Sequence, residues 1–441
     1  MRSVCLYFQI HQPFRLRTYR FFDIGADHYY YDDYQNKRIA RRIARECYIP
    51  ANEVLLGLIN EFGSAFKVTF SISGVAIEQF KKYTPDVIES FKRLAKTGNV
   101  EFLAETYAHS LAGLIDPAEF KRQVREHADA IKELFGVTPT AFRNTELVYS
   151  NSIAGQVYEM GYKTMLTEGA KQLLGWKSPN FVYFSSPYSR LKILLRNYQL
   201  SDDITFRFSQ QNWSEWPLTA EKYVGWLNNV DPKQELVNLF LDYETFGEHQ
   251  KPESGIFGFL RAFPEMLIKT QNWQFRTPSE IVDDLPPVAG IDCPHPISWA
   301  DEERDLTAWL GHDLQNEAFT SLHKVSEIMA HCTDADLHRD WNYLQASDHL
   351  YYMCTKWFSD GEVHQYFNPY GSPYDAFLNY MNVLSDFLIR VREYAAKSPV
   401  QVPAADVQEK KVVKKAAASQ PKPTAKKQAT PKAASNKKVS K

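Results

Sequence analysis

Residues 235–247 read ELVNLFLDYETFG, and this stretch decides the fold. The apolar run from Leu236 to Leu241 is typical of a strand that is buried on both faces of a parallel sheet. Asp242 follows the run directly, at a point where a charge must either serve a function or form a buried ion pair. Parallel barrels hold their catalytic groups where strands end at the carboxyl-terminal edge. The stretch therefore predicts a buried strand with a candidate site at its end.

Further short β-rich runs alternate with helical patterns through the first two-thirds of the chain. Besides the strand at 235–241, we predict strands at residues 3–10, 66–73, 99–104, 140–145, 162–167 and 191–196. Amphipathic helices are predicted between them, as at residues 85–96 and at residues 117–134, the second opened by Asp116 as N-cap and Pro117 in the first turn. Repetition of strand, helix and strand implies a parallel sheet, and seven strands indicate a barrel.

The pattern changes after the Pro-rich segment 285–296, where helices follow one another without an intervening strand. We predict these helices at residues 317–331, 335–349 and 374–396. Beyond about residue 398 the sequence is mostly Ala, Lys, Pro, Ser and Thr, and such a composition cannot bury enough apolar surface to offset chain entropy. The predicted domains are a catalytic (β/α)7-type barrel at residues 1–290, an α-helical domain completing the cleft at 291–397 and a disordered tail at 398–441.

The charge of the chain is divided unevenly. The formal net charge is −2, but residues 410–441 carry eleven Lys and no acidic residue, so residues 1–409 carry −13. An acidic body argues against nucleic acid as a substrate and agrees with a neutral polyol such as a glucan. The basic tail is suited to an acidic partner or surface. The aromatic share of 14% suits sugar stacking, and it suits a large aromatic core equally well.

The five cysteines are odd in number, widely scattered and without a C-x-x-C pair, which indicates neither a disulfide framework nor a zinc site. The first residues, MRSVCLYFQI, lack the basic region and the long apolar run of a secretory signal. No stretch approaches the roughly 20 apolar residues of a membrane span. We therefore expect free thiols, no membrane span and a cytoplasmic location.

Polar side chains follow most of the predicted strands. The candidates at the strand ends are His11, Glu105 with His109, Glu146, Glu168, and Asp242 with Glu244. Carboxylates that converge from different strands are what glycoside cleavage needs, because one attacks or activates water and the other protonates the departing oxygen. Each candidate also has an ordinary structural explanation: a first-turn helix carboxylate for Glu146, a buried ion pair for Asp242, satisfied structural histidines for His11 and His109, and a solvated or paired carboxylate for Glu101.

Five short motifs occur at barrel-like spacing along the chain. They are His11-Gln12-Pro13, Gly98-Asn99-Val100-Glu101, Arg143-Asn144-Thr145-Glu146, Asp242-Tyr243-Glu244-Thr245-Phe246-Gly247 and Thr277-Pro278-Ser279-Glu280. Together they closely resemble, in order, the five sequence regions of glycoside hydrolase family 57. The resemblance extends from about residue 1 to residue 390, and five motifs in the right order are far more specific than any one of them.

This resemblance implies an incomplete seven-fold parallel (β/α) barrel followed by a C-terminal α-helical domain. It also implies action on α-glucans with retention of configuration and without a metal cofactor. Matched by position, Glu146 is the nucleophile and Asp242 the general acid/base. A retaining enzyme needs these carboxyl groups about 5 Å apart. A neighbouring Glu146 and walls formed by Tyr243 and Phe246 would raise the pKa of Asp242, as a general acid requires.

The resemblance also implies residues that bind the substrate. His11, Glu101 and Glu280 are expected around the donor-sugar site, and His109 takes the place of a histidine that often follows the second motif. Asp348, in Gln345-Ala346-Ser347-Asp348, resembles a family position that reaches the cleft from the helical domain. Candidate sugar platforms are Trp299 and Trp357. The fourth motif departs from the family pattern, which commonly has small or polar residues where Tyr243 and Thr245 stand.

Four functions are compared. We favour an α-amylase that hydrolyses starch, glycogen or maltodextrin, over a 4-α-glucanotransferase, in which a sugar hydroxyl rather than water intercepts the covalent intermediate. A non-catalytic glucan-binding protein would not need the intact pair of Glu146 and Asp242. A metal-dependent polysaccharide deacetylase would need a second histidine after His109-Ser110, at the position where Gly113 stands.

Overall fold

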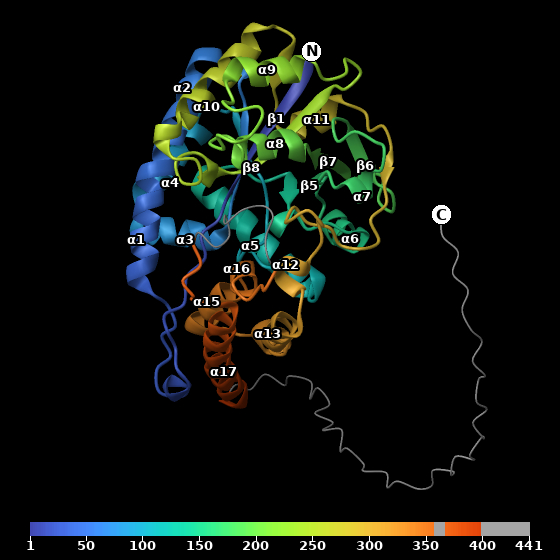
Figure 1. The fold of residues 1–441 in the computed structure, drawn as a ribbon. Coiled ribbons are helices and arrows are strands. Elements are labelled where there is room, and N and C mark those ends of the chain that lie inside the picture. Colours follow the sequence, from blue (N-terminus) through green and yellow to red (C-terminus); the bar gives the residue numbers. More distant parts are fainter. Residues whose placement is uncertain (357–366, 398–441) are drawn as a thin grey trace, which may run out of the picture. The chain divides into compact units, whose positions relative to one another are not determined.

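Parallel strands alternate with helices in the computed structural model, which describes residues 1–356 and 367–397. All seven strands expected from the sequence are present within these ranges. They are β1 (Arg2–Ile10), β2 (Val68–Ile72), β3 (Val100–Phe102), β4 (Ala141–Arg143), β5 (Thr164–Glu168), β7 (Lys192–Arg196) and β8 (Leu236–Asp242). Figure 1 shows β1 running from the N-terminus toward the C-terminal helices, which gather at one end of the barrel.

The strands close into an incomplete barrel. One sheet has the order β3-β2-β1-β8, and a second contains β7-β5-β4. A parallel bridge between Ala104 and Phe142 joins β3 to β4. Between β7 and β8 individual hydrogen bonds replace the regular ladder. Asn238 Nδ2 donates to the Leu195 backbone carbonyl at 2.8 Å, and the Asn238 backbone carbonyl accepts from the Asn197 backbone amide at 2.9 Å. The predicted incomplete seven-fold barrel is confirmed.

Alternation along each strand separates an interior layer from an outer one. On β1, Val4, Leu6 and Phe8 pack outward against the helices, whereas Cys5 and Tyr7 pack inside the barrel. The same period of two applies to β8, where Leu236 and Phe240 face inward and Val237, Leu239 and Leu241 face outward. The buried strand predicted from the run at 236–241 is therefore correct. Each strand thus directs alternate side chains into the barrel interior.

Three short strands were not predicted from the sequence. They are β6 (Val182–Ser185), which runs antiparallel to β7, β10 (Gly290–Ile291), which pairs with β6, and β9 (Trp273–Phe275), which pairs with the first half of β1. Strands of two to four residues have too few positions for a period of two to be recognised. They extend the sheets without changing the order of the seven barrel strands.

Helices cover the outside of the barrel. They are α1 (Asp33–Ile43), α2 (Ile49–Phe62), α3 (Gly74–Tyr83), α4 (Pro85–Ala95), α5 (Pro117–Phe135), α6 (Asn151–Glu159), α7 (Lys171–Leu174), α8 (Tyr198–Thr205), α9 (Ala220–Asn228), α10 (Ile256–Lys269) and α11 (Pro278–Asp284). The predicted start of α5 is confirmed, because the Asp116 carboxylate accepts from the backbone amides of Ala118 and Glu119. The outer helices bury the outward faces of β1, β2 and β8.

The C-terminal part is helical, as predicted. It contains α12 (Thr307–Leu310), α13 (Asp313–His323), α14 (Ser326–Met329), α15 (Ala335–Leu344), α16 (Ser347–Tyr351) and α17 (Pro373–Lys397). The predicted helices 317–331 and 335–349 are each broken in two. The second break has a clear cause: Ala346 is extended and pairs with Ser110, and the Ser347 amide donates to the His109 carbonyl at 3.0 Å. The chain leaves the helix to contact the barrel.

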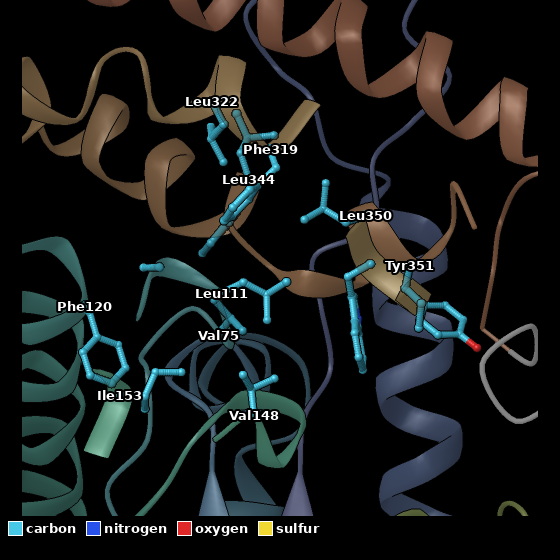
Figure 2. Close-up of a cluster of buried hydrophobic side chains, with 14 of the residues drawn as sticks. Val75, Leu111, Phe120, Val148, Ile153, Phe319, Leu322, Leu344, Leu350 and Tyr351 are labelled. Carbon is cyan, nitrogen blue, oxygen red and sulfur yellow. The ribbon is translucent and has the colours of Figure 1, made fainter. Parts of the chain in front are cut away.

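A shared hydrophobic core joins these helices to the barrel. Figure 2 shows Val75, Leu111 and Val148 of the barrel part below Leu344 and Leu350 of the C-terminal part, and all five belong to one buried hydrophobic cluster. Residues up to Lys397 belong to one compact unit, so the boundary predicted at residue 290 stays a prediction. Residues 398–441, the predicted tail, lie outside the described residues. Among the described residues, no helix is long and apolar enough to cross a membrane.

Candidate active site

The strand ends and the C-terminal helices enclose a cavity of about 90 Å³. It contains six of the nine residues predicted for the site: His11, His109, Glu146, Asp242, Trp299 and Asp348. Other lining residues come from the same strand ends and from α16, among them Gln9, Glu244, Tyr351 and Tyr352. Asp242 is the last residue of β8 and Glu146 lies three residues after β4, so the cavity lies at the carboxyl-terminal end of the barrel.

Glu146 is held by two donors in an unusual backbone conformation. His109 Nε2 lies 3.1 Å from Glu146 Oε1, and Trp299 Nε1 donates to Oε2 at 2.7 Å. The φ angles of His109, Glu146 and Leu147 are 55°, 55° and 51°, in the left-handed region that L-residues rarely occupy. Ser150, rather than Glu146, caps the following helix α6. Glu146 is therefore not a capping carboxylate, and the strained turn serves to direct it into the cavity.

His109 bridges two carboxylates. Its Nδ1 lies 3.1 Å from Glu105 Oε2, while its Nε2 faces Glu146. Burial alone would lower the pKa of His109, but the hydrogen bonds to Glu105 and Glu146 raise it to about 9. Burial likewise favours neutral Glu105, yet the bond to His109 leaves the pKa of Glu105 below its usual value. At neutral pH His109 is therefore an imidazolium that pairs with the Glu105 carboxylate and faces Glu146.

His11 links this group to the C-terminal helices. Its ring stacks on that of His109, with centroids 3.9 Å apart, and its nitrogens contact Ser73 Oγ at 2.7 Å and Asp348 Oδ2 at 2.8 Å. Burial and the neighbouring His109 charge lower the pKa of His11. Burial opposes ionisation of Asp348, but its contact with His11 holds the Asp348 pKa well below the usual range. Neutral His11 thus donates from Nε2 to the Asp348 carboxylate.

Asp242 lies beside a second carboxyl group. Glu244 is fully buried, and burial, followed by the charge of Asp242, raises the pKa of Glu244 to about 8. Tyr48 Oη donates to Glu244 Oε1, and Gln12 Nε2 donates to the same oxygen at 3.3 Å. Glu244 is therefore mostly protonated at neutral pH, and it lines the cavity together with Asp242.

The predicted walls of Asp242 are not found. Tyr243 packs on Phe8 with ring centroids 4.9 Å apart, and its hydroxyl donates to Asn52 Oδ1 at 2.6 Å. Phe246 belongs to the same outer hydrophobic layer. Because side chains alternate along β8, the residue after Asp242 must point away from the cavity. Tyr243 and Phe246 stabilise the outer layer instead of lining the site.

Residues 5–294 match the sequence model of glycosyl hydrolase family 57. The chain belongs to this family. A protein of Methanocaldococcus jannaschii named "Putative alpha-amylase" is 42% identical over 407 residues, which is 89% of this chain and 85% of that protein. The family membership covers the barrel with both candidate catalytic carboxylates.

Solved structures of family 57 enzymes have the same fold. A branching enzyme from Pyrococcus horikoshii is superposed with a TM-score of 0.61 at 15% identity, covering 91% of this chain and 98% of that one. A 4-alpha-glucanotransferase from Thermococcus litoralis also gives 0.61 at 16% identity, covering 79% of this chain. The match spans only 56% of the glucanotransferase. At such low identity these likenesses establish the fold alone.

Glu101 and Glu280, two predicted substrate-binding residues of the family motifs, do not reach the cavity. Glu101 accepts from the Ser279 amide at 3.1 Å and from the Ser279 hydroxyl at 2.5 Å, and Glu280 pairs with Lys67. Leu103 of the interior apolar layer follows β3 and lies between Glu101 and Glu105 along the chain. Four extended residues span about 13 Å, so Glu101 lies about that far along the chain from Glu105, which contacts His109 at the cavity. These two residues fasten α11 to the opposite end of the barrel.

The two predicted sugar platforms have different outcomes. Trp299 lies in the cavity, but its indole is used to hold Glu146, and the guanidinium carbons of Arg143 and Arg196 lie 5.0 and 5.6 Å from its ring centroid. Its side chain is thereby fixed between the nucleophile candidate and two cations. Trp357 lies outside the described residues.

Several lining residues were missed by sequence reasoning. Gln9, Gln12 and Tyr351 carry no signal of their own, because each is an ordinary polar or aromatic residue in or near a predicted element. Strand alternation could have identified Gln9, since it lies two residues before His11 on the inward face of β1. Among the described residues, no group of three or more His, Cys, Asp or Glu side chains has a metal-binding arrangement.

Proposed function

We propose that this family 57 protein is a retaining glycosidase that cleaves α-1,4-glucan, with Glu146 as nucleophile and Asp242 as general acid/base. The observation that carries the proposal is that both carboxylates line one cavity, in which His109 and Trp299 each contact one oxygen of Glu146. A carboxylate held by two donors, one of them cationic, remains ionised and keeps a fixed direction. Both properties are required of an attacking group.

The proposed reaction uses these groups in two displacements. Glu146 attacks the anomeric carbon as the glycosidic bond breaks, and Asp242 gives its proton to the departing oxygen. The product is a β-linked glycosyl ester on Glu146 and a free sugar hydroxyl. Asp242 then takes a proton from water, whose oxygen attacks the anomeric carbon and releases the Glu146 carboxylate. Two inversions restore the α configuration, and Asp242 ends protonated for the next cycle.

Within this class we favour an endo-acting α-amylase on starch, glycogen or maltodextrin. The 42% identical relative supports this, because its name describes an alpha-amylase. The proposal includes a cytoplasmic location, which agrees with five cysteines that are all free and mostly buried. A neutral substrate also suits the acidic body of the chain. The proposal assigns the basic tail to contact with an acidic partner.

A 4-α-glucanotransferase is the second candidate, because a larger cavity adjoins the first one and offers room for a sugar acceptor. A time course on maltoheptaose separates the two functions. Shorter products alone indicate hydrolysis, whereas longer oligomers that form early indicate transfer. Glu146→Ala is the control, and products that persist in this variant would contradict the proposed nucleophile.

A further inference from the structure

A second and larger cavity, of about 760 Å³, lies beside the first. His249 lines both cavities, so the two share a wall. The other lining residues follow β5, β7 and β8, among them Lys171, Tyr198, Arg207, Gln210 and Gln250. The second cavity therefore opens at the same end of the barrel as Glu146 and Asp242, and it is several-fold larger than the space at those carboxylates.

The lining of this second cavity suits a neutral polyol. Its charges nearly balance, because Lys171, Arg207 and Arg304 are offset by Asp202 and Glu302. Arg304 pairs with Asp202 at 3.4 Å, and Arg207 pairs with neighbouring Asp203 at 2.6 Å. Amides and paired charges offer donors and acceptors to hydroxyl groups without attracting a charged ligand.

One aromatic ring in the second cavity is held in place. Lys171 Nζ and the Arg304 guanidinium carbon lie 5.9 and 5.3 Å from the ring centroid of Tyr198. Tyr198 begins α8, next to Asn197, whose side chain caps that helix. A fixed aromatic ring among polar groups provides both an apolar surface and hydrogen bonds, which is the combination that a sugar ring contacts.

Two loops connect this cavity to the catalytic one. The loop after β8 carries Asp242 at its start and His249 and Gln250 further on. Arg304 donates to the Trp299 carbonyl, and Trp299 in turn contacts Glu146. A general acid must stand beside the departing sugar, and the loop that follows Asp242 supplies His249 to the wall between the two cavities.

We propose that the second cavity binds the glucan segment on the leaving-group side of the cleaved bond, and that the same cavity holds a sugar acceptor when one replaces water. This inference rests on the proposed function of Glu146 and Asp242. Tyr198 and Gln210 then contact the leaving part of the glucan, and this cavity determines the chain-length preference.

The test compares maltoheptaose with 4-nitrophenyl α-maltoside, whose leaving group contains no sugar. For Tyr198→Ala we expect the ratio of kcat/KM on maltoheptaose to kcat/KM on the aryl maltoside to fall at least fivefold. Gln210→Ala, an exposed lining position that does not threaten folding, should lower the same ratio at least twofold. Tyr34→Ala, a variant of an exposed tyrosine on α1, is the matched control and should leave the ratio at the wild-type value.

The outcomes are distinguishable. A wild-type protein that cleaves neither substrate would overturn the proposed function and this inference with it. A second outcome is an active wild type, with Tyr198→Ala and Gln210→Ala variants that lose activity equally on both substrates, or lose none. That result would overturn the cavity assignment alone. Equal loss would place these residues on the donor side or in the support of the fold.

Discussion

His109 lies between Glu105 and Glu146, and the positive charge that it carries affects both carboxylates. Glu105 is fully buried, where an unpaired carboxylate would be strongly destabilised. The imidazolium pairs with Glu105 on one side and with Glu146 on the other. A buried cation between two anions costs far less than any of the three charges alone. At the scale of single residues, the proposed nucleophile Glu146 thus lies against a histidine that does not easily lose its proton.

Stability should therefore depend on pH through His109. Its pKa is about 9 in the folded protein and about 6.5 when unfolded, so the native state binds more protons between these values. The stabilisation is complete below pH 6.5 and is lost as pH rises through 9. We expect the free energy of unfolding of the wild type, relative to His109→Gln, to fall by on the order of 3 kcal/mol between pH 6 and pH 10.

Urea unfolding of both proteins across this range measures the difference. His331→Gln, a variant of an exposed histidine on the surface of the C-terminal helices, should follow the wild-type profile. A constant difference between the wild type and His109→Gln would show that His109 is not the protonated group.

Azide separates the roles of the two carboxylates. Glu146→Ala removes the attacking atom, so turnover should fall by several orders of magnitude, and azide can only attack the α-substrate directly to give a β-glycosyl azide. Asp242→Ala keeps the nucleophile, and an aryl leaving group needs no proton. Azide then attacks the covalent intermediate and gives the α-glycosyl azide. The anomers are identified by NMR, and an α-azide from Glu146→Ala would reverse the assignment.

Placement of the cavity residues could be predicted where a residue directly follows a strand. Asp242 and Glu146 directly follow the predicted strands 235–241 and 140–145, and the ends of parallel strands converge, so their common cavity was foreseeable. Glu101 and Glu280 were expected there through the motifs alone. Their positions already opposed it: Glu280 lies in the first turn of α11, and Glu101 lies inside the predicted strand 99–104, four residues before Glu105 and therefore in a different layer.

At the scale of elements, the break between α15 and α16 has a specific consequence. It turns Asp348 toward His11, which could not occur if residues 335–349 formed one continuous helix. Asp348→Asn should therefore lower kcat/KM on maltoheptaose at least tenfold, or roughly 1.4 kcal/mol, with folding intact. Asp336→Asn, on the exposed start of α15, is the matched control. Unchanged kinetics in Asp348→Asn would remove this residue from the site.

The contact between β3 and α11 should affect stability and not catalysis. Glu101→Ala leaves the amide and the hydroxyl of Ser279 without their acceptor in a half-buried place. We expect a loss of about 1–3 kcal/mol in the free energy of unfolding, measured in urea, and kcat/KM within twofold of wild type. A tenfold loss of kcat/KM in a folded protein would return Glu101 to the substrate site.

Elements were predictable where the sequence shows a clear apolar pattern. All seven barrel strands and the long helices α4, α5 and α17 follow a clear apolar pattern. The strands β6, β9 and β10 were missed, whereas β3 and β4, which are equally short, were predicted as parts of the longer segments 99–104 and 140–145. The breaks inside the predicted helices 317–331 and 335–349 depend on contacts with distant segments, such as the pairing of Ala346 with Ser110, and no local pattern reveals them.

At the scale of the whole molecule, the helical part and the barrel depend on one hydrophobic core. Val148, two residues after Glu146, and Leu350, two residues after Asp348, lie in the same cluster, and Tyr351 of this cluster also lines the catalytic cavity (Figure 2). Packing that holds the two parts together therefore also fixes the distance between groups that face the substrate. The C-terminal helices act as one wall of the site.

The basic tail should be separable from this catalytic unit. Residues 400–441 contain eleven Lys and two acidic residues, so a chain that ends at Pro399 has a net charge of −11 in place of −2. The family match ends at residue 294 and every described cavity residue precedes 398, so kcat/KM on maltoheptaose should stay within about twofold. The full chain should bind an acidic surface, and the truncated chain should not. Binding of the full chain should weaken as salt rises above about 0.1 M, where the screening length is about 10 Å. Retention on a cation-exchange matrix across a salt series measures this. A larger loss of kcat/KM would show that the tail reaches the cavity, and equal retention of both proteins would show that the eleven lysines are not available to a partner.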